Sequence, residues 1–348
     1  MPAPAWLETA IESLAQGQPC VLVTVAAAEG SAPREPGSKM LVHPAGIAGS
    51  IGGGHLELKA IEQARSLLEA HEAAAPRVAR YALGPSLGQC CGGKVALLLE
   101  RLGPDALAWL ARWREPQAGL LLATSLADGC KTIHDASDLP EPRLAGCAAR
   151  LIERGETARL TEGEPAFLLE RIGIAAEALY LFGAGHVGRA LVHVLAPLPY
   201  DIHWFDGRPE MFPAGLPANV ATEISAEPRH DAARAPAGAI FLVMTHNHAL
   251  DFEICEQVLK RGDFSFLGLI GSASKRATFL RRLGQRGFSD AALARLTCPI
   301  GLPQVPGKQP AAIAVAVAGQ LLAHSAALAS QRRPAARRAV NARGTESA

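Results

Sequence analysis

One glycine-rich segment near the middle of the chain constrains its fold most strongly. Gly183, Gly185 and Gly188 form a G-x-G-x-x-G element between an apolar run that ends at Phe182 and a helical pattern. This strand, turn and helix context is typical of the βα turn of a Rossmann-like domain. There the first glycine permits the tight turn, the second lets the backbone approach a phosphate, and the third lets the helix pack on the strand. The helix N-terminus then offers free N–H groups to an anion.

The segment after this turn does not decide whether the domain binds a nucleotide. The next apolar run ends at Asp206, and an acid roughly 20 residues beyond the glycines suits a ribose hydroxyl. Arg208 could meet a phosphate, which leaves NAD(P) binding open. The alternative is a Rossmann-like domain that has lost its nucleotide. His186, inside the glycine turn, is unusual for a plain dinucleotide fingerprint.

Strand and helix patterns alternate in the second half of the chain, which predicts a parallel sheet with helices on both faces. The first half mixes the two patterns without alternation and shows no internal repeat. We therefore expect an N-terminal α+β domain over 1–172, a C-terminal Rossmann-like domain over 173–330, and a disordered basic tail over 331–348. The predicted strands and helices of the second half are near 178–182, 202–205, 239–244 and 265–270, and near 187–195, 249–261, 273–286 and 309–329.

Composition excludes some classes of function. The net charge of +1 argues against a nucleic-acid binder that relies on bulk electrostatics. No run reaches about 18 uninterrupted apolar residues, so no transmembrane helix and no membrane partner are expected. The first residues have neither the basic nor the apolar region of a signal peptide. The seven cysteines are irregularly spaced, which favours a reducing cytoplasm over a disulfide framework.

Two glycine-rich loops of the first half are candidate ligand loops. Gly52, Gly53 and Gly54 directly precede a predicted helix, and such a loop can form an anion nest from its backbone N–H groups. Arg34 and Lys39 could add phosphate contacts. The alternative is a hairpin and a strand-to-helix turn that need glycine only for their backbone angles.

Cys90 and Cys91 lie in the second loop, between Gly88 and Gly93. Adjacent cysteines cannot chelate one zinc ion comfortably. A soft thiolate in a glycine-rich loop could instead ligate molybdenum or accept sulfur. The alternative is a turn with two small buried residues.

Three segments of the second half also carry candidate ligand groups. His246, His248 and Asp251 follow an apolar strand, where imidazole and carboxylate suit a metal or an oxyanion; the alternative is that both histidines cap backbone groups. Ser272 and Ser274 are candidate N-caps, and Lys275 and Arg276 follow in the first helical turn. A cation is disfavoured there unless an anionic ligand is near, the alternative being a solvated helix face. A rigid loop over 298–310 is most simply structural.

Taken together and in this order, these segments resemble the XdhC/CoxI family of xanthine dehydrogenase accessory proteins. The resemblance covers about residues 5–330, and the combination is specific although each piece is weak. It departs from the family at His55, because many relatives carry Cys after the triple glycine; Cys90 and Cys91 are then the remaining thiol candidates. The resemblance rests on the segments 30–34, 49–57, 91–93, 183–188, 206–210, 245–248, 268–272 and 298–301.

The resemblance implies a binding and delivery protein. It implies an N-terminal XdhC domain, and a chaperone that binds the molybdenum cofactor (molybdopterin), protects it and delivers it to xanthine dehydrogenase after sulfuration by a cysteine desulfurase. Family members look like homodimers. No nucleophile–base set for catalysis is recognisable, so we expect an accessory protein and not an enzyme. The alternative is an NAD(P)-dependent oxidoreductase that uses the 183–188 turn.

The residues that we expect to bind the cofactor are those of the motifs above, with molybdenum itself assigned to Cys90 and Cys91. The full set is Arg34, Lys39, Gly52, Gly53, Gly54, His55, Cys90, Cys91, Gly183, Gly185, His186, Gly188, Asp206, Arg208, His246, His248, Ser272 and Lys275.

Overall fold

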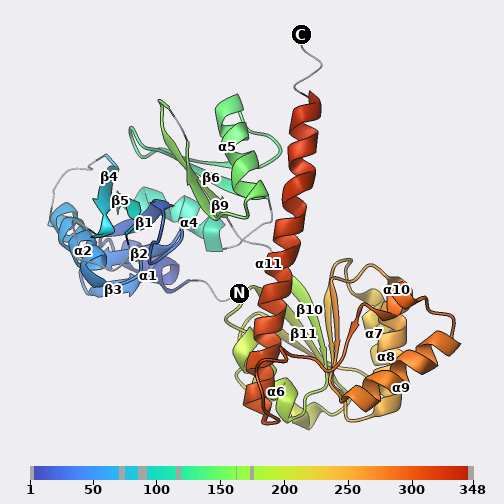
Figure 1. The fold of residues 1–348 in the computed structure, drawn as a ribbon. Helices are drawn as coiled ribbons and strands as arrows, with labels where there is room; N and C mark the ends of the chain where they lie inside the picture. Colours follow the sequence, from blue (N-terminus) through green and yellow to red (C-terminus); the bar gives the residue numbers. More distant parts are fainter. Residues whose placement is uncertain are drawn as a thin grey trace. The chain divides into compact units, whose positions relative to one another are not determined.

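The computed structural model divides into two compact units, Ala3–Ala175 and Ala176–Leu328 (Figure 1). The structure describes residues 4–69, 75–84, 92–114, 119–161, 163–172 and 176–343, with side chains through residue 328.

The C-terminal unit is built on a parallel sheet of order β12-β11-β10-β13-β14-β15. The predicted Rossmann-like sheet with helices on both faces is therefore confirmed. The short strands β12 and β15, which lie at the two edges of the sheet, are not among the predicted strands. The elements are β10 (Glu177–Phe182), α6 (His186–Leu195), β11 (Tyr200–Asp206), η2 (Pro209–Met211), β12 (Val220–Ile224), α7 (Pro228–Arg234), β13 (Ile240–Val243), α8 (His248–Arg261), β14 (Phe266–Leu269), α9 (Ala273–Gln285), α10 (Asp290–Leu293), β15 (Leu296–Thr297) and α11 (Pro310–Arg343).

Two apolar cores cover the two faces of this sheet, because side chains alternate along each strand. Leu179 and Leu181 of β10 face a core shared with α6 and α11. Tyr180 and Phe182 of the same strand face a core shared with α8 and α9. The central strands are buried on both sides, as expected of a parallel sheet, so the ligand-accessible backbone lies at their carboxyl ends.

Helix α11 differs from the prediction. The sequence predicts a helix that ends near residue 329, followed by a disordered tail, whereas the backbone stays helical to Arg343. Alanine and arginine dominate this segment and have high helix propensity. Its stretch Pro310–Leu328 is long and apolar enough to cross a membrane by length and composition alone. Ala314, Val317 and Leu321 of that stretch are buried in the core of the sheet, which accounts for part of its apolar character.

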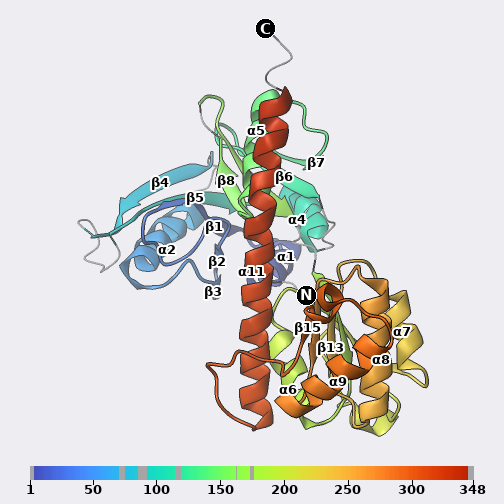
Figure 2. The same ribbon diagram turned by 45° about the vertical axis from the view of Figure 1, so that its right-hand side comes forward.

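The N-terminal unit contains two antiparallel sheets, of order β3-β2-β1-β5-β4 and β7-β6-β9-β8, so the predicted α+β class is confirmed (Figure 2). Helix α2 packs on the first sheet and α5 on the second. The elements are α1 (Ala5–Ala15), β1 (Cys20–Glu29), β2 (Lys39–His43), β3 (Gly46–Gly49), α2 (Gly54–Glu69), β4 (Arg77–Ala82), β5 (Lys94–Leu102), η1 (Pro104–Ala106), α4 (Leu107–Arg114), β6 (Leu120–Ser125), β7 (Lys131–Asp135), α5 (Pro142–Glu153), β8 (Ala158–Leu160) and β9 (Phe167–Ile172).

These two sheets repeat one motif. In each, a helix is followed by a hairpin, a second helix and another strand pair; β1 pairs with β2 and β5 as β6 pairs with β7 and β9. Register agrees as well: Thr24 lies opposite Lys39, and Thr124 lies opposite Lys131. Residues 96–102 read A-L-L-L-E-R-L, and residues 166–172 read A-F-L-L-E-R-I. The prediction of no internal repeat is therefore wrong.

The repeat has no fixed period because its connectors differ in length. Three connectors are longer in the first copy, and these longer connectors contain the candidate glycine loops. The corresponding pairs are 30–38 and 126–130, 44–53 and 136–141, and 83–93 and 161–166.

Candidate functional site

Glycine contacts bring the connectors of the first copy together at one end of the first sheet. A Cβ on Gly52, whose φ is +117°, would lie 2.6 Å from the Cβ of Pro33. A Cβ on Gly93 would overlap the carbonyl oxygens of Glu29 and Ser31. The three loops therefore approach one another through positions that only glycine can occupy. Segments far apart in the sequence thus form one loop cluster.

The predicted anion nest holds an internal carboxylate. Oε2 of Glu57 accepts hydrogen bonds from the backbone N–H groups of Ile51 and Gly53, at 3.1 and 3.0 Å, and from Oγ of Ser50 at 2.7 Å. Burial alone would raise the pKa of Glu57, but these hydrogen bonds lower it below its ordinary value. The glycine amides therefore already stabilise a negative charge, one that the protein itself supplies.

Two predicted side chains of this cluster remain accessible. Arg34 follows Pro33 in the first connector, and His55 lies in the first turn of α2; both are exposed. Across the described ranges, Arg34 has no carboxylate within ion-pair distance. Cys90 and Cys91 lie outside the described residues.

Lys39 cannot play its predicted role as a phosphate contact. Its side chain is buried, and Nζ lies 2.5 Å from Oε1 of Glu170 and 2.9 Å from Oγ1 of Thr24. Nζ also lies over the rings of Trp6 and Trp113. Burial lowers the pKa of Lys39, and the charge of Glu170 opposes this shift. Glu170 is 131 residues away in sequence, so no local pattern could reveal the pair.

A second pair mirrors this one across the repeat. Nζ of Lys131 lies 2.7 Å from Oε1 of Glu100 and 2.8 Å from Oγ1 of Thr124. Each lysine therefore binds the threonine of its own copy and the glutamate of the other copy. These reciprocal pairs join the two sheets and leave neither ammonium group for a ligand.

The 183–188 turn of the C-terminal unit has the geometry of a phosphate-binding turn. Gly183 has a φ of +114°, and a Cβ there would overlap the carbonyl oxygen of Met244. A Cβ on Gly188 would overlap the carbonyl oxygen of Gly183. A Cβ on Gly185, in contrast, would meet nothing within 4 Å. Gly183 and Gly188 are thus needed for the fold, whereas the space beside Gly185 is open to a ligand.

The carboxylate of Asp206 is occupied by hydrogen bonds from within the protein. Its carboxylate accepts hydrogen bonds from the backbone N–H of Ala184 at 2.7 Å and from Nε and Nη2 of Arg208 at 2.9 and 3.0 Å. Burial would raise the pKa of Asp206, but Arg208 and the Ala184 amide lower it below its ordinary value. Asp206, the predicted ribose contact, and Arg208, the predicted phosphate contact, therefore pair with each other, which does not favour NAD(P) binding.

A small cavity of about 90 Å³ lies at the carboxyl edge of the sheet, beside Gly183, Asp206, Thr245 and His246. This volume is below the roughly 300–1,000 Å³ of ordinary small-molecule pockets. The side chains of His186, His246 and His248 are exposed around this edge. They are available to a ligand that lies on the edge.

Asn247 caps α8, so the interpretation of both neighbouring histidines as caps is wrong. Its Oδ1 accepts hydrogen bonds from the N–H groups of Ala249 and Leu250. Asp251 is fully buried and accepts a hydrogen bond from Oγ1 of Thr245 at 2.7 Å. No group of three His, Cys, Asp or Glu side chains suited to a metal ion occurs within the described part of the chain.

Lys275, predicted to face an anionic ligand, instead forms an ion pair with Asp251, with 2.6 Å between Nζ and Oδ2. Oγ of Ser272 accepts a hydrogen bond from the N–H of Lys275 at 3.2 Å, so of the two candidates Ser272 and Ser274 it is Ser272 that caps α9. The neighbouring Arg276 has no carboxylate within ion-pair distance in the described ranges. The accessible cation of this helix start is thus Arg276, which the set of predicted site residues omits.

Family models match both units. A model described as the XdhC Rossmann domain matches residues 179–321, and one described as the XdhC and CoxI family matches residues 13–82. The chain is 24% identical over 300 residues to the molybdenum cofactor insertion chaperone PaoD of Escherichia coli, which covers 85% of this chain and 80% of PaoD.

Two further relatives add less specific information. The chain is 31% identical over 149 residues to the uncharacterized protein YqeB of Escherichia coli, a match to 41% of this chain that spans only 26% of YqeB. A crystal structure from Bacillus halodurans, described as a xanthine dehydrogenase, superimposes with a TM-score of 0.70 at 23% identity. It covers 93% of this chain and 96% of that chain, and it supports the fold alone.

Proposed function

Because this chain belongs to the XdhC and CoxI family, we propose that it is a molybdenum cofactor chaperone that binds the cofactor, protects it and hands it to an enzyme. The observation that carries the proposal is the similarity to PaoD, because it extends over 85% of the chain and so includes both units. The carboxylates of Glu57, Asp206 and Asp251 support it further. Each accepts a hydrogen bond from a backbone N–H group of the protein, which suits a binding scaffold better than acid–base catalysis.

In the N-terminal unit, we propose that the loop cluster contacts the cargo. The cofactor is a pterin dithiolene with a phosphate and an oxo-anionic metal, so it needs cationic and soft partners. Arg34 and His55 are exposed at this cluster, beside the Gly52 loop. Cys90 or Cys91 would supply the thiolate that holds molybdenum. Neither cysteine is among the described residues, so the support for this assignment is the chemistry of the thiolate.

In the C-terminal unit, we propose that an anionic group lies on the N-terminus of α6. The open space beside Gly185 and the exposed His186 and His246 support this placement. The oxidoreductase alternative gains no support, because the Asp206 carboxylate it would use is occupied by Arg208.

The remaining steps rest on the family resemblance. The recipient would be xanthine dehydrogenase or a related molybdenum enzyme, and sulfuration by a cysteine desulfurase would precede transfer. A homodimer in the cytoplasm would perform the delivery.

The decisive experiment is purification of the chain from a host that makes the cofactor, followed by assays of molybdenum and pterin. We expect both in the purified protein, and we expect activation of an apo-enzyme only when the cofactor is present. Cys90→Ser/Cys91→Ser should lower the molybdenum content, whereas Cys130→Ser, at an exposed cysteine elsewhere, should not. Protein without pterin that instead oxidises NAD(P)H with a small carbonyl substrate would refute the chaperone.

A further inference from the structure

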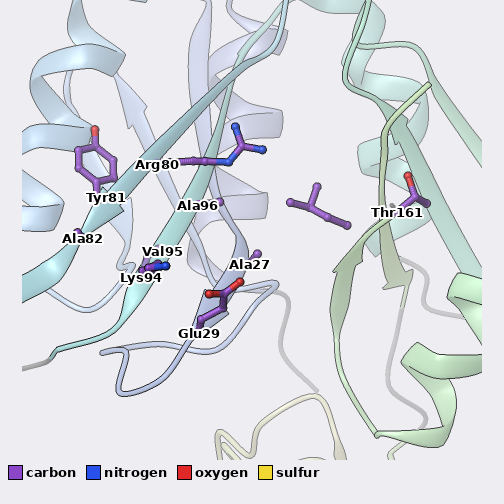
Figure 3. A pocket seen from close by; sticks show the side chains of 10 residues that line it. Ala27, Glu29, Arg80, Tyr81, Ala82, Lys94, Val95, Ala96 and Thr161 are labelled. Atoms are coloured by element: carbon purple, nitrogen blue, oxygen red, sulfur yellow. The ribbon is translucent and has the colours of Figure 1, made fainter. Parts of the chain in front are cut away.

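A pocket of about 500 Å³ lies at the connector end of the first sheet, within the N-terminal unit (Figure 3). This volume falls within the roughly 300–1,000 Å³ of ordinary small-molecule pockets. Figure 3 shows the Arg80 guanidinium and the Glu29 carboxylate on one side of the sheet, with Thr161 across the hollow. The Tyr81 ring lies on the other side of β4, where its hydroxyl accepts a hydrogen bond from Gln63.

Strand register explains why this end of the sheet is hollow. Ala27 and Arg80 flank Ala96 in one row across β1, β5 and β4. Two residues along, Glu29 and Ala82 flank Lys94 in the same way. Since side chains two apart share a face, both rows point to the same side. Three of these six positions are alanine, which leaves space above the sheet that larger side chains would fill.

The second copy of the repeat forms the far wall. Further along the same face, Leu98 packs against Ala158 and Leu168 of the second sheet. At the pocket, β8 contributes only Leu160 and the following Thr161. The two sheets therefore separate where the alanines begin, and the pocket opens between them.

The charges at this pocket are not used by the fold. Among the described residues, Arg80, Lys94 and Glu29 form neither an ion pair nor a side-chain hydrogen bond. By the register through Glu100 and Glu170, the first residue of β9, Phe167, is the counterpart of Leu97, so β9 has no position that matches Lys94. Lys94, the cation at the pocket rim (the Lys94 rim), therefore belongs to the first copy and not to the repeated fold.

We propose that this pocket holds the phosphorylated pterin of the cargo, an assignment that rests on the proposed function. Arg80 and Lys94 attract the phosphate. The Glu29 carboxylate accepts the two adjacent N–H donors of the 2-amino-4-oxopyrimidine edge, a bidentate pairing with a planar partner. The alanine floor and Leu160 pack on the flat ring. The recognised ligand is thus a planar anion with a guanidine-like edge.

Fluorescence titration with 6-carboxypterin tests this assignment on the full chain. This probe is anionic and keeps the 2-amino edge, whereas 6-carboxylumazine has an oxygen in place of the amino group. We expect the pterin to bind about tenfold more tightly than the lumazine, because loss of a hydrogen bond to a charged group costs about this factor. Glu29→Gln should remove the preference, and Arg80→Ala should weaken both probes by about tenfold.

Arg77→Ala is the matched control, since Arg77 is an exposed arginine on β4 whose side chain points to the opposite face. It should bind both probes like the unaltered protein. Molybdenum and pterin content of the purified variants separates this inference from the proposed function. Unaltered protein without cofactor refutes the proposed function. The pocket assignment alone is refuted if the unaltered protein carries the cofactor and Glu29→Gln and Arg80→Ala match it in both cofactor content and probe affinity.

Discussion

Breaking the buried Lys39–Glu170 pair should destabilise the N-terminal unit severely. Both side chains are nearly inaccessible, at 2% and 3% exposed, so bulk solvent does not reach Nζ to replace a lost carboxylate. Glu170→Gln leaves the ammonium group with Thr24 and two aromatic rings, and Lys39→Met leaves a bare carboxylate. Each single change should lower the free energy of unfolding by about 3–5 kcal/mol. Lys39→Met/Glu170→Met buries no unpaired charge and should recover most of that loss.

Urea unfolding followed by tryptophan fluorescence measures this effect. In a Trp204→Phe background the other three tryptophans all belong to the N-terminal unit, so the signal reports that unit. The Lys131–Glu100 pair supplies the parallel experiment, with the same expected direction. Single changes that cost less than about 1 kcal/mol, or a double variant no more stable than the singles, would refute the reasoning, because a buried pair must show strong coupling.

Three further predictions follow from local geometry. Gly185→Val should fold normally yet lose cofactor, whereas Gly188→Ala should lower the thermal stability. Calorimetry and a pterin assay distinguish the two variants. A cofactor content of Gly185→Val equal to that of the unaltered protein would contradict the placement of the anionic group beside Gly185. The lowered pKa of Asp206 stabilises the folded protein at pH values above the ordinary Asp pKa of ~4, and this stabilisation is lost as the pH falls through the folded-state pKa. In Asp206→Asn, the free energy of unfolding should therefore fall less steeply at acid pH. Burial raises the pKa of Cys20 to about 12, so at neutral pH a thiol reagent should modify the exposed Cys130 and spare Cys20 until urea unfolds the chain; rapid labelling of Cys20 in the native protein would show that its burial is wrong.

The sequence was sufficient for the C-terminal fold because its signals are local. Strand, glycine turn and helix follow one another within a few residues around Gly183, and steric contacts at Gly183 and Gly188 need nothing distant. The same proximity limits the cap of α9 to Ser272 or Ser274, and the structure has Ser272. Backbone conformation that depends on neighbours in sequence can be predicted from the sequence.

The charged side chains were harder to assign because their partners are distant in sequence or already engaged. Lys39 meets Glu170, Lys275 meets Asp251, and the Gly53 amide meets Glu57. In each case a group predicted to face an anionic ligand already faces an internal carboxylate. A motif shows which residue types are present, but only the fold shows which charges remain unpaired.

Comparison of the two copies of the repeat in the N-terminal unit separates side chains that stabilise the fold from side chains that are available to a ligand. Groups that serve the fold occur in both copies: Lys39 and Glu100 have the counterparts Lys131 and Glu170 in a reciprocal network. The longer connectors and the Lys94 rim occur only in the first copy, and the second copy folds without them. Since stability requires only what the copies share, the differences are the part of the unit free to serve a ligand. Gly30 and Gly93, the described connector residues next to Glu29 and Lys94, approach each other at the end of the sheet where Glu29 and Lys94 line the pocket of Figure 3.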